Sequence, residues 1–141
     1  MPLRTVRTFI AGQRPLTVPR TMTVADVAQQ MKVQGKGACI VVEGSRLIGI
    51  FTERDALFRV IAARLDPTTT AVGSVMTRDP QTIHPDRSFV EALRMMYEGR
   101  YRHMPVVEDG RPLGMVSSRD ALAPELHELR NDLELRDADR E

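Results

Sequence analysis

Two periodic patterns of apolar and polar residues, one helical and one typical of strands, follow one another along this chain. This pair of patterns occurs twice. In the first half, apolar side chains recur every three or four positions from residue 24, which is typical of an amphipathic helix. Two short apolar runs come next with a glycine-containing turn between them, and this pattern indicates a β-hairpin. The predicted elements are an extended piece at 17–18, a helix from 23, strands at 38–42 and 47–51, and a helix from 52 that carries Leu57, Phe58 and Ile61.

The second half repeats this pattern, because residues 17–57 align without a gap on residues 82–122. An ungapped duplication indicates two copies of one folding unit, here β-α-β-β-α. The predicted elements are an extended piece at 81–84, a helix from Ser88 with Phe89, Leu93, Met96 and Tyr97 as its apolar stripe, strands at 104–107 and 112–117, and a helix from Ser117 through Ala121 and Leu122.

Each repeat has only about 60 residues, a length at which a separate core is marginal. We therefore expect the two halves to pack on each other as one module. Residues 1–72 would hold an N-terminal segment plus the first repeat, and residues 73–141 the second repeat plus a charged C-terminal helix. The apolar stretch 6–10 is expected to pack on the core as a helix or turn. The tail from 125 reads as a partly solvated helix, with a dimer-contact helix as the alternative.

Charge and composition exclude several classes of protein. The 141 residues include 20 Lys and Arg against 19 Asp and Glu, so the net charge of +1 predicts no strong nucleic-acid binding. There is no Trp to stack on bases, and the single cysteine, Cys39, lies in an apolar run and is expected to be buried. The apolar runs are too short to cross a membrane, and the N-terminus lacks a signal-peptide core, so we predict a cytoplasmic protein.

The two copies share one phrase at a strand-to-helix junction, Gly-x-x-Thr/Ser-x-Arg-Asp-Ala-Leu. A helix N-terminus suits phosphate, an arginine adds a full positive charge, and a carboxylate can accept hydrogen bonds from ribose hydroxyls. The phrase therefore predicts a nucleotide site in each copy. Its residues are Gly49, Thr52, Arg54 and Asp55 in the first copy, and Gly114, Ser117, Arg119 and Asp120 in the second.

A purely structural interpretation of this phrase is also open. Thr52-x-x-Asp55 and Ser117-x-x-Asp120 are helix capping boxes as well as candidate ligand sites, and such a pattern on its own is more often a cap. A glycine inside a strand favours the ligand interpretation, because it marks a place where a ligand or another backbone approaches closely.

These residues resemble a CBS domain, and the whole chain resembles a CBS pair, or Bateman module. The resemblance covers 17–64 and 82–127 and rests on the shared glycine, hydroxyl and aspartate, with Arg102-His-Met-Pro-Val-Val107 in the second copy. It implies an α/β (α+β) fold in which two β-α-β-β-α repeats pack about a pseudo-twofold axis. It also implies clefts that bind an adenosine-containing ligand, namely AMP, ADP, ATP, S-adenosylmethionine or NAD(H).

The resemblance also implies a role for each site residue. Asp55 and Asp120 would hold the ribose hydroxyls, and Thr52 and Ser117 would contact ribose or phosphate. Basic phosphate contacts would come from Arg102 and His103. The base pocket would be lined by Thr82, Ile83, Met104 and Pro105, with Thr17 and Val18 as the corresponding extended piece of the first copy.

The two copies differ where the phosphate contacts are expected. Arg102-His103-Met104-Pro105 of the second copy corresponds to Gly37-Ala38-Cys39-Ile40 of the first. We therefore expect the Asp120 site to bind a phosphorylated ligand better, with the Asp55 site weaker, empty or suited to a less charged adenosyl group. The alternatives to phosphate binding are a structural role for His103 and a solvated side chain for Arg102.

The function these patterns favour is a non-catalytic sensor that binds an adenine nucleotide as a regulatory ligand and requires no cofactor. Its partners would be a second copy of the chain, as a homodimer, and an effector protein that the sequence does not name. The alternative is a ligand-independent dimerisation module with vestigial sites. An enzyme is disfavoured, because no nucleophile and base stand at a recognisable spacing, and the histidines lack metal-ligand spacing.

Overall fold

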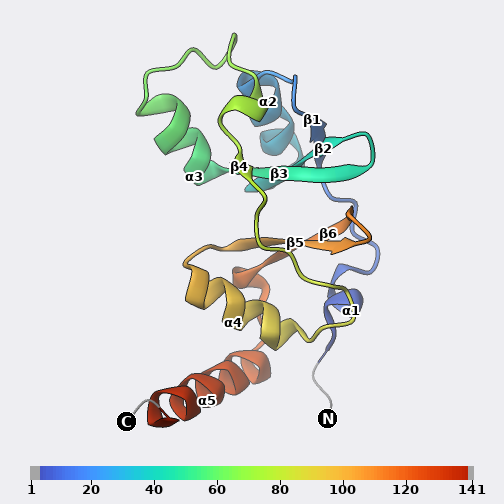
Figure 1. Ribbon diagram of the computed structural model, residues 1–141, viewed down its shortest axis with the longest axis vertical. Helices are drawn as coiled ribbons and strands as arrows, with labels where there is room; N and C mark the ends of the chain where they lie inside the picture. The colour runs from blue at the N-terminus through green and yellow to red at the C-terminus, as the bar shows by residue number, and fades with distance from the viewer. Residues whose placement is uncertain (1–3, 140–141) are drawn as a thin grey trace.

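The computed structural model describes residues 4–139, which form two α+β units stacked along the long axis of the molecule (Figure 1). Each unit places a sheet toward the middle and helices on the outer side of that sheet (Figure 1). The two sheets meet through β3 (Arg46–Thr52) and β6 (Arg111–Ser117), and the amide of Leu47 donates a 3.0 Å hydrogen bond to the carbonyl of Gly110. The α+β fold of two repeats expected from the sequence is confirmed.

The first unit is a four-stranded sheet in the order β1-β2-β3-β4. Strand β1 runs parallel to β2, and the other neighbours are antiparallel. Helix α2 begins where the Thr23 hydroxyl accepts a hydrogen bond from the Asp26 amide, and it ends at Gly35 in the left-handed conformation. The elements are β1 (Thr17–Pro19), α2 (Val24–Gln34), β2 (Ala38–Glu43), β3, α3 (Glu53–Asp55) with a π-helical continuation (Ala56–Ile61), and β4 (Thr77–Arg78).

The second unit pairs β5 (His103–Glu108) with β6, and α4 (Phe89–Gly99) covers the sheet. An isolated parallel bridge between Ile83 and Val106 takes the place that β1 has in the first unit. Phe89, Leu93 and Met96 are buried as predicted, but Tyr97 is 64% exposed. Its inclusion in the apolar stripe was wrong, because each residue turns about 100° around a helix and Tyr97 lies at the edge of that stripe.

The N-terminal segment packs on the second unit. Helix α1 (Val6–Ile10) buries Val6 and Ile10 in the same core as Phe89. The apolar stretch therefore forms a helix on a core, as expected. That core belongs to the second repeat, whereas the division predicted from the sequence places residues 6–10 with the first repeat.

The predicted helix from Ser117 through Leu122 is wrong. A single 3₁₀ turn (Ser118–Asp120) follows β6, Ala121 is extended with ψ 138°, and helix α5 (Ala123–Asp139) begins afterwards. The reason is Pro124, which has no amide hydrogen and could not donate to the Asp120 carbonyl in a continuous helix. The corresponding residue of the first copy is Arg59, which allows α3 to continue.

Each unit has its own apolar core, and Cys39 is fully buried in the first. Burial raises the pKa of the Cys39 thiol to about 12, so this residue is inert as a nucleophile. Across residues 4–139, none of the helices is long and apolar enough to cross a membrane.

Candidate functional site

In the first repeat, the shared phrase forms a closed capping box at the start of α3. The Thr52 amide donates to Asp55 Oδ2 at 3.0 Å, and the Asp55 amide donates to Thr52 Oγ1 at 3.2 Å. The Thr77 hydroxyl donates to Asp55 Oδ1 at 3.2 Å, and Arg59 Nε lies 3.4 Å from the same oxygen. Because Asp55 is only 7% exposed, its carboxylate is occupied by the protein itself.

The arginine of this first phrase is also directed to its own helix. The Arg54 guanidinium lies 5.0 Å from the centre of the Phe58 ring, a cation–π contact on the exposed side of the helix. The structural interpretation of the phrase therefore fits the first copy.

In the second repeat, the same phrase leaves its aspartate open. The Ser117 side chain makes no capping hydrogen bond, and both Arg119 and Asp120 are exposed. Within residues 4–139, no hydrogen bond or ion pair to the Asp120 carboxylate is found. Only its backbone carbonyl is engaged, by Arg4 Nη2 at 2.9 Å. The carboxylate remains available to a ligand.

The two strand glycines are explained by the protein's own chain. A Cβ at Gly49 would lie 2.6 Å from Met76 Sδ, and a Cβ at Gly114 would lie 2.8 Å from Ile10. Helix α1, which precedes the first repeat, packs against β6 at Gly114. The linker before β4, which precedes the second repeat, packs against β3 at the equivalent residue, Gly49. The close approach predicted from these glycines is real, but it brings no ligand to them.

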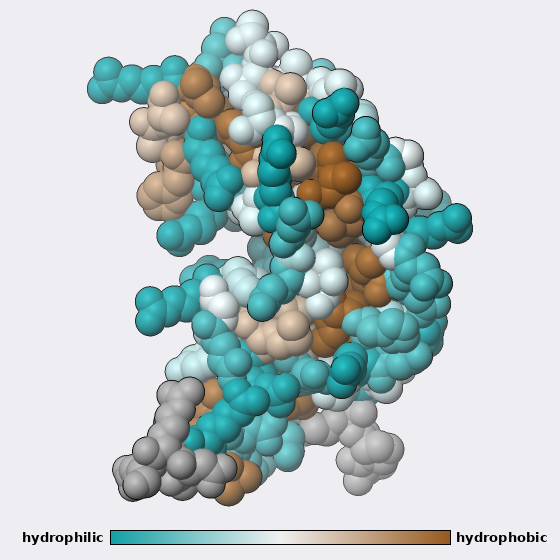
Figure 2. Space-filling view, viewed as in Figure 1, coloured by the Kyte–Doolittle hydropathy of each residue, from teal (hydrophilic) through white to brown (hydrophobic). Residues whose placement is uncertain are grey.

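A cavity of about 240 Å³, called the central pocket below, lies between the two units. Figure 2 shows a notch between the units on one side of the molecule. The pocket brings Ser117 and Arg119 of the second phrase together with the beginning of β2 in the first repeat. Its lining is Gln13, Pro15, Leu16, Gly35, Lys36, Gly37, Ala38, Ile40, His103, Met115, Ser117 and Arg119.

The central pocket therefore combines one repeat's phrase with the other repeat's strand ends. The predicted base-pocket residues do not line it: Ile83, Met104 and Pro105 are buried in the second unit, Val18 is buried in the first, and Thr17 and Thr82 are exposed. Sequence reasoning missed Lys36, Gly37 and Ile40, because it assigned each site to a single copy. A rule that pairs each phrase with the strands of the other repeat would have found them.

Positive charge gathers around this pocket at the junction of the units. His103 is packed so closely against the first repeat that a Cβ at Gly37 would lie 3.4 Å from its Nε2. Burial lowers the pKa of His103, and the positive charges of Arg119 and Arg102 lower it further. Glu53 and Asp120 oppose this shift. A bound anion near His103 would relieve the repulsion among these cations, so the pocket suits a phosphate.

A larger cavity of about 490 Å³ lies on the first unit, beside the turn after β1 and the linker before β4. Arg20, Glu43, Ile48 and Arg78 are among its lining residues, and none of the predicted site residues is. The smaller central pocket is the candidate site, because it joins Ser117 and Arg119 of the second phrase to His103 and Lys36. Asp120 follows Arg119 in the chain and is not among the residues that line the pocket. The volume of the central pocket is just below the range of about 300–1,000 Å³ common for small-molecule sites.

Comparison with known proteins identifies the family. Residues 6–62 and 72–124 match the CBS domain family. The chain is 39% identical over 104 residues to the CBS domain-containing protein CBSCBSPB3 of Arabidopsis thaliana, covering 73% of this chain but only 19% of that protein.

Solved structures agree with this match. A protein with CBS domains from Burkholderia ambifaria is 31% identical, with a TM-score of 0.77 over 83% of this chain and 90% of that one. The CBS domain protein PAE2072 of Pyrobaculum aerophilum, solved in complex with AMP, has a TM-score of 0.80 over 91% of this chain and 99% of that one. At 23% identity, that likeness concerns the fold alone. The chain belongs to the CBS domain family, and it carries two CBS repeats.

Proposed function

We propose that this CBS pair is a non-catalytic sensor that binds a phosphorylated adenosine ligand in the central pocket. The observation that carries the proposal is a pocket lined by Ser117, Arg119 and His103. The unoccupied carboxylate of Asp120, the residue after Arg119, is near enough to oppose the lowering of the pKa of His103. A carboxylate suits vicinal ribose hydroxyls, and the cations suit phosphate. The AMP complex of a protein with this fold is consistent with such a ligand.

We expect one ligand per chain rather than two. The first-repeat phrase has its aspartate bound by Thr52 and Thr77, so a ribose there would have to displace hydrogen bonds within the protein. AMP, ADP and ATP are the leading candidates, because Lys36, His103 and Arg119 line the pocket and suit a phosphate. S-adenosylmethionine and NAD(H) are the alternatives to test beside them.

Thermal unfolding with each candidate ligand tests this proposal. A ligand at 100 times its dissociation constant adds about 2.7 kcal/mol of stability, which raises the melting temperature of a chain this size by several degrees. We expect AMP, ADP or ATP to give that shift. The absence of a shift with all three, and with S-adenosylmethionine and NADH, would refute the sensor. Product formed from ATP would overturn its non-catalytic character.

The same sensor is proposed to act as a homodimer on an effector protein. Apolar side chains are exposed at equivalent places in both repeats: Leu57, Phe58 and Ile61 after the first phrase, and Leu122 and Leu126 after the second. An apolar surface of this kind is typical of a contact between chains. Sedimentation should show a dimer that Ile61→Asp shifts toward monomer, whereas a monomeric wild-type chain would contradict this part of the proposal.

These exposed apolar side chains also support a second candidate, a ligand-independent dimerisation module. It predicts a dimer with the same stability and the same sedimentation in the presence and absence of nucleotide. The sensor predicts that AMP, ADP or ATP changes at least the stability. The cytoplasmic location and the weakness of nucleic-acid binding both stay predictions from the sequence.

A further inference from the structure

The Asp120 turn depends on a residue far away in the chain. In a continuous helix, the carbonyl of residue 120 would accept a hydrogen bond from the amide of residue 124, and Pro124 has no such hydrogen. The guanidinium of Arg4 takes that place, with Nη2 2.9 Å from the Asp120 carbonyl oxygen. The N-terminal segment therefore satisfies the acceptor that the proline leaves without its helical partner.

Arg4 is itself held rigidly. Its Nε and Nη2 donate to the two carboxylate oxygens of Glu125 at 2.7 and 3.0 Å, and Glu125 is only 2% exposed. The guanidinium lies 4.9 Å from the centre of the Phe9 ring and 4.6 Å from that of Phe89. Such a fork between two rings fixes the direction of the remaining N–H toward Asp120.

Glu125 completes the connection on the other side of the turn. Its Oε1 accepts a 2.8 Å hydrogen bond from the Leu122 amide, so the same ion pair fixes the residues before and after Ala121. The first repeat has Arg59 and Val60 at the positions of Pro124 and Glu125. Arg59 is part of the helix and contacts Asp55 itself, so within the described residues this tether is found at the Asp120 turn and not at Asp55.

We propose that Arg4, held by Glu125, is a positioning residue for ligand binding, which fixes the Asp120 turn so that its carboxylate meets the ribose. The inference rests on the proposed function, because it assigns Asp120 to ribose. Arg4 touches no ligand in this account. Its loss lets the 3₁₀ turn move, and the ribose contact weakens while the phosphate contacts at His103 and Arg119 remain.

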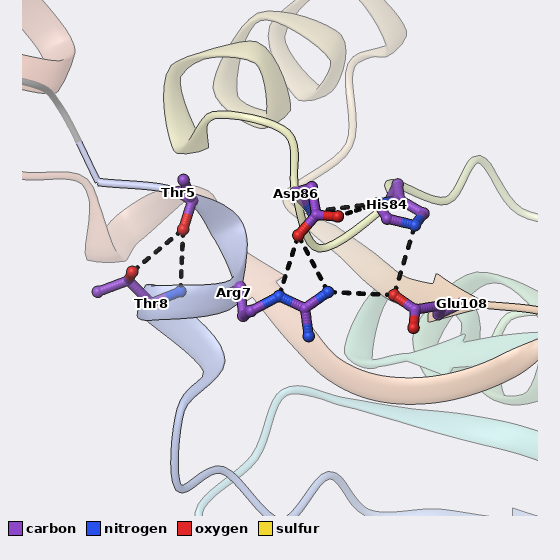
Figure 3. Close-up of polar contacts among 6 residues, drawn as sticks. All are labelled: Thr5, Arg7, Thr8, His84, Asp86 and Glu108. Atoms are coloured by element: carbon purple, nitrogen blue, oxygen red, sulfur yellow. Dashed lines mark hydrogen bonds and ion pairs between the residues drawn. The ribbon is translucent and has the colours of Figure 1, made fainter.

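Arg7 offers a matched control within the same segment. It also ties α1 to the second unit, donating to Asp86 at 3.0 Å and to Glu108 at 3.1 Å, with His84 beside the same two carboxylates (Figure 3). Among residues 4–139, no hydrogen bond or ion pair of this network reaches the Asp120 turn. A variant of Arg7 therefore reports what loosening of the N-terminal segment alone does to the site.

The test measures dissociation constants for AMP and for adenosine by calorimetry, at a temperature well below the unfolding of every variant. Arg4→Lys keeps the charge pair with Glu125 but lacks the second arm of the fork. Arg4→Met combined with Glu125→Gln removes the buried charges together and keeps an acceptor for the Leu122 amide. We expect both variants to bind AMP and adenosine about tenfold more weakly, by the same factor for the two ligands. Arg7→Gln should bind both as the wild type does.

The outcomes separate this inference from the function on which it rests. If the wild-type chain binds neither AMP nor adenosine, the proposed function fails. If it binds them and the folded Arg4 variants bind equally well, Arg4 is not a positioning residue. An equal loss in Arg7→Gln would assign the effect to general loosening, and a loss confined to AMP would assign it to the phosphate; either result overturns the inference.

Discussion

The two repeats present the same Thr/Ser-x-Arg-Asp phrase, and the structure uses it in two different ways. In the first repeat the aspartate closes a capping box and receives the Thr77 hydroxyl and Arg59. The offset of 65 residues that aligns the two repeats places Gly12 at the position of Thr77 and Pro124 at the position of Arg59, and these two offer neither a hydroxyl nor a positive charge. An aspartate is thus made structural or available by residues outside the phrase that carries it.

The largest expected effect separates the two aspartates directly. We expect Asp120→Ala to weaken AMP binding about a hundredfold, because a charged acceptor of ribose hydrogen bonds is lost. Asp55→Ala should leave AMP binding unchanged and instead lower the free energy of unfolding by about 2 kcal/mol, since a cap and buried hydrogen bonds disappear. Calorimetric titration and urea unfolding measure the two effects, and loss of AMP binding in Asp55→Ala would contradict the comparison.

A second experiment tries to convert the open phrase into a closed one. Pro124→Ala restores the amide that a continuous helix needs at that position, so Asp120 would be drawn toward its own helix as Asp55 is. We expect a gain of helical signal in circular dichroism and about tenfold weaker AMP binding. Unchanged affinity together with a longer helix would show that the break at Ala121 does not keep the carboxylate available.

The smallest expected effect concerns His103, whose counterpart in the first repeat is Ala38. Burial and the charge of Arg119 lower its pKa in the folded protein without ligand. A phosphate beside it would favour the protonated ring, so AMP binding takes up a proton. We expect AMP affinity to rise about threefold from pH 8 to pH 6.

Phosphate itself titrates near pH 6, so the matched control is His103→Gln, which keeps the ligand's own titration and loses the histidine's. Adenosine should show little dependence on pH in either protein. An identical pH profile for AMP in His103→Gln would remove His103 from the phosphate site.

The same lowered pKa has a consequence for stability with a definite sign. The unfolded chain binds a proton at His103 as the pH falls through about 6.5, whereas the folded protein does so only at lower pH. The unfolded state therefore holds more protons in that window, and the free energy of unfolding falls as the pH falls below about 6.5. His103→Gln should flatten this part of the curve of stability against pH, measured by denaturant titration; an unchanged slope would contradict it.

Local sequence was sufficient for most of the fold. Capping residues such as Thr23 and Ser88 begin α2 and α4 where the sequence predicts, and Gly44 and Gly110 adopt positive φ in the hairpin turns. These features depend on neighbours within a few positions. The helix predicted from Ser117 is wrong for an equally local reason, because Pro124 lacks the amide hydrogen that Arg59 supplies at the same position of the first copy.

Contacts between distant segments could not be read from the chain. Nothing near Val6 or Arg4 indicates that the N-terminal segment packs on the second unit, more than 80 residues away, because burial depends on which apolar faces meet in space. The pocket likewise joins Gly37 of one repeat to Ser117 of the other. A duplicated sequence pattern predicts the structure of each unit, but it does not predict which residues of the two units line a common pocket.

The family, the two repeats and the residues of the shared phrase are encoded locally, because they follow from residue spacing and from one ungapped alignment. Which aspartate is available to a ligand is set by the folded chain. That choice depends on Thr77, Arg59 and Arg4, and on whether each lies within hydrogen-bonding distance of a particular oxygen. Such distances are set by the packing of whole units, and the letters of the phrase are the same in both.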